Sequence, residues 1–548
     1  MNASRRIDVG LFVALSLLAN GYRYGSADHA LHLPMIDAVL DPERWAGDAL
    51  VAAAEHHHTV WFWLLAPAFA VVGPAATMAL GHLAVLAATG AAVRALALEL
   101  WGTRQAAWWA LILLAAGHAT VGGAPTMDPL LLPRGAALPL ELTAFWLAMR
   151  GRAGWAFGLL GVTAWLHAPS AAAATAALAC WHGSRRGDLR ALGAVFVGAA
   201  PILLLWALRG DAGAAVMDDA WWRVVRARSA HHVAPSTWSS EEWWRLANWA
   251  GLGVLAVWRG PRRGLAAFGA GALLWAVVVG SGLGEAAKVA LAVQLEAWEA
   301  ARFLVVAAGL ALAGGLAARP GWLTAALGLA VAARVPGTAL AMVAVLAVDG
   351  LGGRRGPALR LGWLAPLAAA VLYGAARFPP DGYERRTQLV VQPTPIEHWI
   401  GENTAPGDLI AVAPGSHERL RWAARRPVVA TWKDGGEALF SRSFALRFRE
   451  RMHAACGCAV LDGAGPLHRP PGERLAGLRR VLDRDHSAEP LPHRRAVARA
   501  EGASWLVTHA RGESGGAAFV DGRWAIYDLR APPTTNAEPP TPGTPRSR

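Results

Sequence analysis

Apolar residues are spread unevenly along the chain, and their pattern divides it into two parts. From Val9 to Ala376 they form long runs that are broken only by short segments carrying Arg, or Pro and Gly. After Arg377 such runs stop, and the rest of the sequence has an ordinary polar composition. Long apolar runs are typical of membrane-spanning helices. The pattern therefore predicts a mainly α, polytopic membrane helix bundle, residues 1–377, followed by a small soluble α/β domain.

The runs predict about 11–13 crossings, several of them shorter than the roughly 20 residues that a span needs. Arg5 and Arg6 precede the first run and further Arg clusters follow later ones, which predicts a cytoplasmic N-terminus. An odd number of crossings then places the loop 21–58 and the C-terminal domain on the exoplasmic side. The runs 60–72 and 75–93 are counted together as one net crossing. The full set of runs is 9–19, 60–72, 75–93, 106–121, 136–149, 155–166, 170–181, 189–208, 246–258, 265–279, 303–318, 322–333, 335–348 and 361–376.

The C-terminal third, residues 378–530, has the pattern of an α/β domain. Asp521-Gly522 lies between two strand-like runs and predicts a hairpin turn. Residues 531–548 are rich in Pro and Thr, which predicts a disordered tail. Short β-branched runs predict buried strands at 409–413, 428–431 and 504–509, and helical spacing predicts helices at 442–455 and 473–482.

Composition and charge narrow the class of protein. Of the 548 residues, 54% are hydrophobic and 17% are charged, which excludes a disordered chain, a collagen-like fibre and a small disulfide scaffold. The net charge of +13 is unusual, but the basic residues form small clusters between apolar runs. We interpret them as an orientation signal in a lipid bilayer and expect no nucleic-acid partner. Among the 52 basic residues only Lys288 and Lys433 are lysine.

The first exoplasmic loop concentrates polar chemistry. Asp28 follows the first span by a few residues, where a carboxylate acts as a general base toward a hydroxyl if its neighbours tune its pKa. Alternatively, Asp28 caps the helix predicted over 29–40, since Asp is a favoured N-cap. His29 and His32, three positions apart, form a candidate divalent metal site with Asp28. The run His56-His57-His58 lacks a metalloenzyme spacing and is interpreted as the start of an interfacial helix.

Asp128 and Arg134 form a second outward cluster. Asp128 is predicted to pair with Asp28 across a cavity, and Arg134 to hold a phosphate through its guanidinium fork. The alternatives are an Asp in a turn and an Arg that snorkels to the interface. His167, at an outward corner between two short runs, is a third candidate.

The fourth candidate is a polar stripe. Gln294, Trp298 and Arg302 are four positions apart and are predicted to share one face of a helix that enters a span. Such a stripe is costly unless it faces a cavity or a partner. Arg302 is therefore the preferred anion-binding residue, and a structural ion pair with Glu296 or Glu299 is the alternative.

Together these features resemble the GT-C superfamily of membrane glycosyltransferases. The stripe that ends at Arg302 is similar to polar motifs at outward helix ends of bacterial relatives, and residues 395–410 resemble the start of their exoplasmic C-terminal domain. The acidic pair of that family's first loop is absent, because His29 follows Asp28. The other matching elements are Asp28 just after the first span, Leu40-Asp41-Pro42 and Asp48 in a large first loop, and Asp128 as a second outward acid.

The resemblance implies transfer of a sugar from a polyprenyl-phosphate donor to an acceptor hydroxyl on a glycan, lipid or protein at the outer face of the plasma membrane. The set Asp28, His29 and His32 leaves a divalent metal as a candidate cofactor. A transporter or lipid flippase, and a non-catalytic scaffold whose domain binds the cell envelope, are the alternatives. The implied roles are catalysis for Asp28 and Asp128, phosphate binding for Arg134 and Arg302, and further substrate binding for His29, His167, Gln294 and Trp298.

Overall fold

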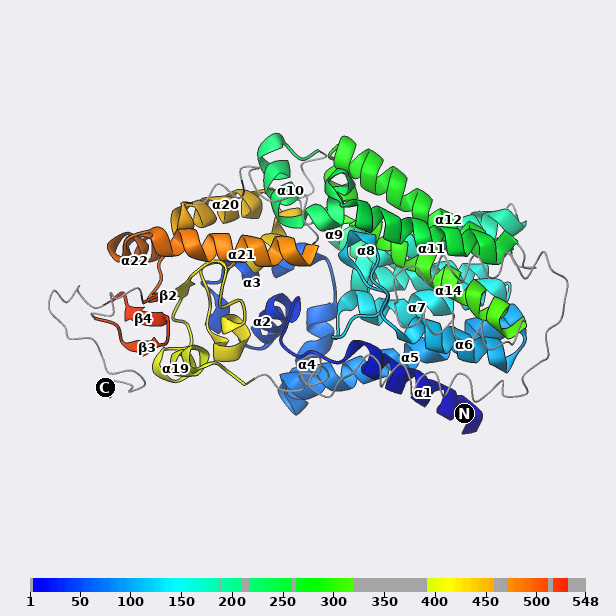
Figure 1. The fold of residues 1–548 in the computed structure, drawn as a ribbon, viewed down its shortest axis with the longest axis horizontal. Coiled ribbons are helices and arrows are strands. Elements are labelled where there is room, and N and C mark those ends of the chain that lie inside the picture. Colours follow the sequence, from blue (N-terminus) through cyan, green and yellow to red (C-terminus); the bar gives the residue numbers. More distant parts are fainter. Residues whose placement is uncertain are drawn as a thin grey trace.

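The computed structural model describes residues 3–186, 189–208, 216–258, 263–318, 392–457, 461, 471–510 and 516–530. The predicted runs 322–333, 335–348 and 361–376 and the predicted tail 531–548 lie outside these residues. Within them the chain is mostly helical, and the only sheet is small and C-terminal. Figure 1 shows the helices up to residue 318 at one end of the molecule and the sheet at the other. The mostly helical character and the small C-terminal sheet of the predicted fold are confirmed.

The helices of the first part follow the predicted apolar runs closely. Gly73, with φ of 82°, and Pro74 separate two of them, and Gly102, with φ of 68°, ends the second. Thr103 accepts a hydrogen bond from the Ala106 N–H and starts the next. The helices are α1 (Ala3–Asn20), α4 (Trp61–Val72), α5 (Pro74–Trp101), α6 (Arg104–Ala115), α7 (Pro133–Met149), α8 (Ala153–Arg186), α9 (Gly193–Leu208), α11 (Ser240–Trp258), α12 (Arg263–Trp275) and α14 (Ala301–Ala318).

These helices, apart from α4, share one apolar core, whereas α4 packs in a second one with the first loop. Helix α1 packs against α5 and α6, α8 lies between α7, α9 and α12, and α14 packs against α6, α11 and α12. The helices approach each other closely where small residues lie between them. At Gly90 of α5, for example, an added Cβ would lie only 2.9 Å from the Phe12 side chain of α1. Helix α8 merges the predicted runs 155–166 and 170–181 but breaks at His167, whose φ of −155° is not helical.

Three described segments are long and apolar enough to cross a membrane, namely Pro74–Trp101, Gly264–Ala286 and Ala297–Ala318. Two shorter apolar helices, Trp61–Val72 and Arg190–Leu205, add to them. Segments of this length and composition indicate a membrane protein. The larger number of crossings stays a prediction.

The first loop folds into short helices instead of an open segment. They are α2 (His29–Leu40), as predicted over 29–40, then η1 (Glu43–Trp45), α3 (Ala49–Ala52) and η2 (Ala53–His57). Helix α2 packs against α4 on one side and against η9 and η10 of the C-terminal part on another. The loop is therefore enclosed between the helical part and the C-terminal part (Figure 1).

The C-terminal part joins a four-stranded sheet to five helices. The strands β1 (Ile410–Val412), β2 (Trp505–His509), β3 (Phe519–Asp521) and β4 (Trp524–Asp528) have the order β1-β2-β4-β3, with β1 and β2 parallel and the others antiparallel. Asp521-Gly522 forms the predicted hairpin turn. The predicted strand 428–431 is reduced to one bridge, between Val428 and Ile410. The helices are α19 (Pro395–Asn403), η10 (Trp432–Leu439), α20 (Arg442–Cys456), α21 (Pro471–Ala488) and α22 (Leu491–Ala500), and η9 (Arg421–Arg425) is a π turn.

Shorter elements connect the two parts. The π segment η7 (Ala276–Ala286) continues α12, and α10 packs against η10 and α20 of the C-terminal part. The remaining connecting elements are η3 (Val121–Gly123), η4 (Arg190–Leu192), α10 (Asp219–Val233), η6 (Pro235–Thr237), α13 (Ala290–Gln294) and η8 (Ala297–Ala300).

Candidate functional site

Asp28 lies where the first loop meets both the helical part and the C-terminal part. Its carboxylate is 2.5 Å from Lys433 Nζ and 3.9 Å from an Arg134 nitrogen. It makes no side-chain hydrogen bond to the N-terminus of α2, so capping by the side chain is not observed. The Asp28 side chain is 30% exposed. It is therefore held between two cations and keeps access to solvent.

The electrostatics keep Asp28 ionised. Burial alone would raise the pKa of its carboxyl, but the charges of Lys433 and Arg134 hold that pKa well below its usual value of 3.8. At neutral pH Asp28 is consequently a carboxylate with two cations as neighbours.

Arg134 connects the acidic residues. Two of its nitrogens donate to the Asp128 carboxylate at 3.0 and 2.8 Å, in the bidentate geometry expected of a guanidinium fork. Its third nitrogen lies 3.5 Å from Glu299 Oε1. Asp28 and Asp128 thus meet through Arg134. The sequence had predicted that they pair directly with each other. We call Asp28, Asp128, Arg134, Glu299 and Lys433 the Asp28 cluster.

Arg302 lies deeper, in a buried ion pair. It donates to Glu141 Oε2 at 2.6 Å and to the backbone carbonyl of Arg134 at 3.2 Å. The Arg302 and Glu141 side chains are 2% and 1% exposed. The structure therefore shows the structural ion pair that the sequence left as the alternative role of Arg302. The partner is Glu141, and not the predicted Glu296 or Glu299. Arg302 therefore contacts the backbone of Arg134 and is itself almost fully buried.

The predicted helical stripe is wrong as a continuous face. Helix α13 ends at Gln294, and Glu296 adopts a left-handed conformation with φ of 40°, which breaks the helix before α14 begins. Gln294 instead donates to the Phe440 carbonyl at 3.3 Å, in the C-terminal part. Trp298 is 1% exposed and packs against Trp238 and Trp243.

The two histidines predicted to bind substrate have different surroundings. His29 is fully buried, and its ring nitrogens meet the Gly25 N–H at 3.1 Å and the Leu131 carbonyl at 3.0 Å. Burial lowers its pKa to about 4, so the ring is neutral. No nitrogen of His29 is left for the predicted metal site with Asp28 and His32. His167 lies at the break in α8, close enough to Arg302 and Arg134 for their positive charges to act on its ring.

A second charged cluster anchors the first loop. Arg421 donates to Asp48 at 2.7 Å and to both oxygens of Asp434 at 2.7 Å, and all three side chains are buried. Asp48 also accepts from the N–H groups of Leu50 and Val51 and so caps α3. We call Arg421, Asp48 and Asp434 the Arg421 cluster.

Several residues in these clusters or beside them were not among the sequence candidates for catalysis or binding. They are Lys433, Glu437 and Arg421 from the C-terminal part, and Glu141, His232 and Glu299 from the helical part, of which Glu299 was named only as an alternative partner of Arg302. Lys433 carried one signal, because lysine is rare in this chain. Glu437 contacts His57 of the first loop at 2.8 Å, and Arg425 contacts Asp37 at 2.8 Å.

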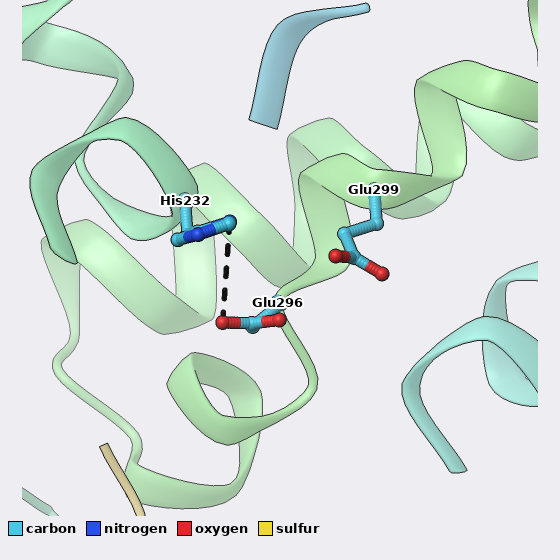
Figure 2. A group of neighbouring side chains, drawn as sticks. All are labelled: His232, Glu296 and Glu299. Atoms are coloured by element: carbon cyan, nitrogen blue, oxygen red, sulfur yellow. Dashed lines mark ion pairs between the residues drawn. The ribbon is translucent and has the colours of Figure 1, made fainter. Parts of the chain in front are cut away.

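Glu299 of the Asp28 cluster also lies near two further groups, His232 and Glu296 (Figure 2). Glu296 Oε1 is 4.0 Å from His232 Nδ1. Burial raises the pKa of Glu296 to about 7, although the charge of Arg134 opposes the change. Burial also lowers the pKa of His232.

Comparison with known proteins adds one match. A sequence-family model described as a domain of unknown function, DUF6798, matches residues 394–455. No curated protein matches the chain. The matched segment contains Arg421, Arg425, Lys433 and Glu437, which form ion pairs with the first loop, and Asp434, which pairs with Arg421.

Proposed function

We propose that the protein is a GT-C-like membrane glycosyltransferase that moves a sugar from a polyprenyl-phosphate donor to an acceptor hydroxyl. In this proposal the bundle has about 11–13 spans, the N-terminus is cytoplasmic, and the Asp28 cluster and the C-terminal part lie at the outer face. The observation that carries the proposal is the ionised, partly exposed Asp28 carboxylate between Lys433 and Arg134.

The charges of the cluster suit this substrate. A phosphate that carries a lipid tail needs cations close to an apolar bundle, and Lys433 and Arg134 are 18% and 14% exposed at such a place. Arg binds phosphate through its fork and Lys as a point charge. A phosphate bound there would draw both cations away from Asp28, and the pKa of Asp28 would then rise toward its usual value. Donor binding would thereby make Asp28 a stronger base.

The reaction then follows from these positions. Asp28 accepts the proton of the acceptor hydroxyl, and the acceptor oxygen forms a bond to the anomeric carbon. The bond between that carbon and the phosphate oxygen breaks, and its electron pair leaves on the polyprenyl phosphate. Lys433 and Arg134 stabilise the charge on the departing phosphate. Asp128 and Arg302 hold Arg134 in position from two sides.

The test uses full-length protein reconstituted with a polyprenyl-phosphate sugar. Asp28→Asn is expected to lower turnover by about 10²–10⁴-fold while the fold is retained. The same variant should bind polyprenyl phosphate at least as tightly as wild type, because it removes a negative charge beside the anion. Lys433→Met should weaken that binding by about tenfold, as expected for one charge-assisted contact.

Asp41→Asn is the matched control, since Asp41 lies on the same loop but pairs with Arg44 away from the cluster. It should leave turnover and binding unchanged. Unchanged turnover in Asp28→Asn would remove Asp28 from the mechanism. Movement of the lipid-linked sugar across liposomes without bond cleavage would favour a transporter or flippase instead.

A further inference from the structure

A group of three potential metal ligands lies outside the residues used by the proposed reaction. One ring nitrogen of His232 and one oxygen from each of Glu296 and Glu299 all lie within 4.8 Å of one another. Figure 2 shows the three side chains reaching the same space from α10, from the turn before η8 and from η8 itself. Segments far apart in the sequence thus bring one imidazole and two carboxylates together.

The charges of this group are not balanced by the surrounding protein. Glu299 is 1% exposed, and its Oε2 accepts no hydrogen bond from any described residue. Its other oxygen is 3.5 Å from Arg134, but Arg134 is already engaged by the fork to Asp128. Glu296 has no cation among the described residues nearer than the His232 ring at 4.0 Å. A buried carboxylate oxygen without a partner is costly, so it points to a ligand that carries positive charge.

The geometry is already close to that of an occupied site. An ion about 2.0–2.2 Å from each donor needs donor separations of no more than roughly 4.2 Å, so the side chains must rotate to bring the donors closer than the present 4.8 Å limit. Nδ1 of His232 lies 2.7 Å from the Gly122 carbonyl, which leaves Nε2 as the nitrogen that binds the ion. Backbone support of this kind is usual for histidines that bind metals.

We propose that His232, Glu296 and Glu299 bind a divalent transition cation, Zn²⁺ or Mn²⁺. The imidazole favours these ions over Mg²⁺ and Ca²⁺, which prefer oxygen ligands throughout. Three protein ligands leave further coordination positions for water. The site replaces the metal set predicted from Asp28, His29 and His32. It does not rest on the proposed transfer reaction, because metal binding is measured without a sugar donor.

Calorimetric titration of chelator-treated full-length protein in detergent with Zn²⁺, Mn²⁺ and Mg²⁺ tests this site. Wild type is expected to bind one Zn²⁺ or Mn²⁺ per chain, more tightly than Mg²⁺, and to unfold at a higher temperature with the ion bound. His232→Gln and Glu296→Gln should each weaken binding by more than about tenfold. Glu296 forms no short contact with other described side chains, so its variant is expected to fold.

Two neighbouring variants serve as controls. His231→Gln alters the adjacent ring, and His56→Gln alters the run of three histidines in the first loop; both should bind the ion as wild type does. X-ray absorption of the Zn²⁺ complex should show imidazole scattering in wild type and lose it in His232→Gln. The proposal fails if wild type binds no ion at this stoichiometry, or if Glu296→Gln and His232→Gln bind as tightly as the two controls.

Discussion

Two charged clusters each place an Arg between two Asp carboxylates. They differ in how fully the hydrogen bonds of these side chains are satisfied. In the Arg421 cluster the guanidinium donates to Asp48, to Asp434 and to the Val428 carbonyl, and none of the three side chains is more than 3% exposed. In the Asp28 cluster, Arg134 lies between Asp128 at 2.8 Å and Asp28 at 3.9 Å, and Asp28 is 30% exposed.

The difference separates a cluster whose contacts are all satisfied from one whose contacts are exchangeable. Buried charges whose hydrogen bonds and ion pairs are all satisfied hold one geometry. Removing one partner leaves the others buried without a counter-charge, which costs a large free energy. Partly exposed charges with loose contacts can exchange their partners for a ligand at little cost. The short helix η10 carries Asp434 of the first cluster and Lys433 of the second. The Arg421 cluster therefore sets the place at which Lys433 meets Asp28.

The largest effect on stability is expected from Arg421→Met. The substitution leaves Asp48 and Asp434 buried without their cation, which should lower the free energy of unfolding by about 3–5 kcal/mol. Thermal unfolding followed by Trp fluorescence measures the loss, and protease sensitivity of the first loop shows whether the loop detaches.

Arg425→Met is the control within the same π turn. Arg425 is 52% exposed and pairs with Asp37 of the same loop, so its loss should change stability by no more than about 1 kcal/mol. Equal stability of the two variants would show that the Arg421 cluster does not hold the loop in place.

A smaller effect is expected from Arg302→Lys. Lysine keeps the ion pair with Glu141 but cannot also donate to the Arg134 carbonyl in the same geometry, which should destabilise the protein by about 1–3 kcal/mol. Arg104→Lys is the control and should have little effect, because Arg104 is half exposed and its buried partner Asp8 keeps its ion pair with Arg94. If Arg302→Lys instead left stability intact and weakened polyprenyl-phosphate binding, Arg302 would be the anion ligand that the sequence favoured.

Local chemistry was predictable from the sequence where one segment decides the structure. Helix α2 spans residues 29–40 as expected, and Asp521-Gly522 turns between β3 and β4 because Gly522 accepts a positive φ of 55°. The predicted strand 428–431 fails for a non-local reason. Its residues enter the Arg421 cluster through the Val428 N–H and carbonyl, and only one bridge to β1 remains.

The candidate site was predictable only in part. Asp28, Asp128 and Arg134 stood out because polar residues beside apolar runs are rare, and the structure brings them together. The partner of Asp28 is 405 residues away in sequence, which no local pattern reveals. The polar stripe was wrong because periodicity assumes an unbroken helix, whereas Glu296 adopts a left-handed backbone.

The smallest expected effect is a pH dependence of stability. It comes from another ion pair of η10, between Glu437 and His57. Burial alone would lower the pKa of His57, but the charge of Glu437 and the hydrogen bond to it raise that pKa above the usual 6.5, and Glu296 adds to the increase. Because the folded protein holds this proton more tightly, the stabilisation is fully present below pH 6.5 and is lost as the pH rises through the raised value. We expect the free energy of unfolding of wild type to fall between pH 6 and pH 9 by an amount on the order of 1 kcal/mol, measured through the accompanying fall in thermal midpoint. His57→Gln and Glu437→Gln should remove that part of the slope, whereas His56→Gln should keep it. An unchanged slope in both His57→Gln and Glu437→Gln would assign the pH dependence to other groups.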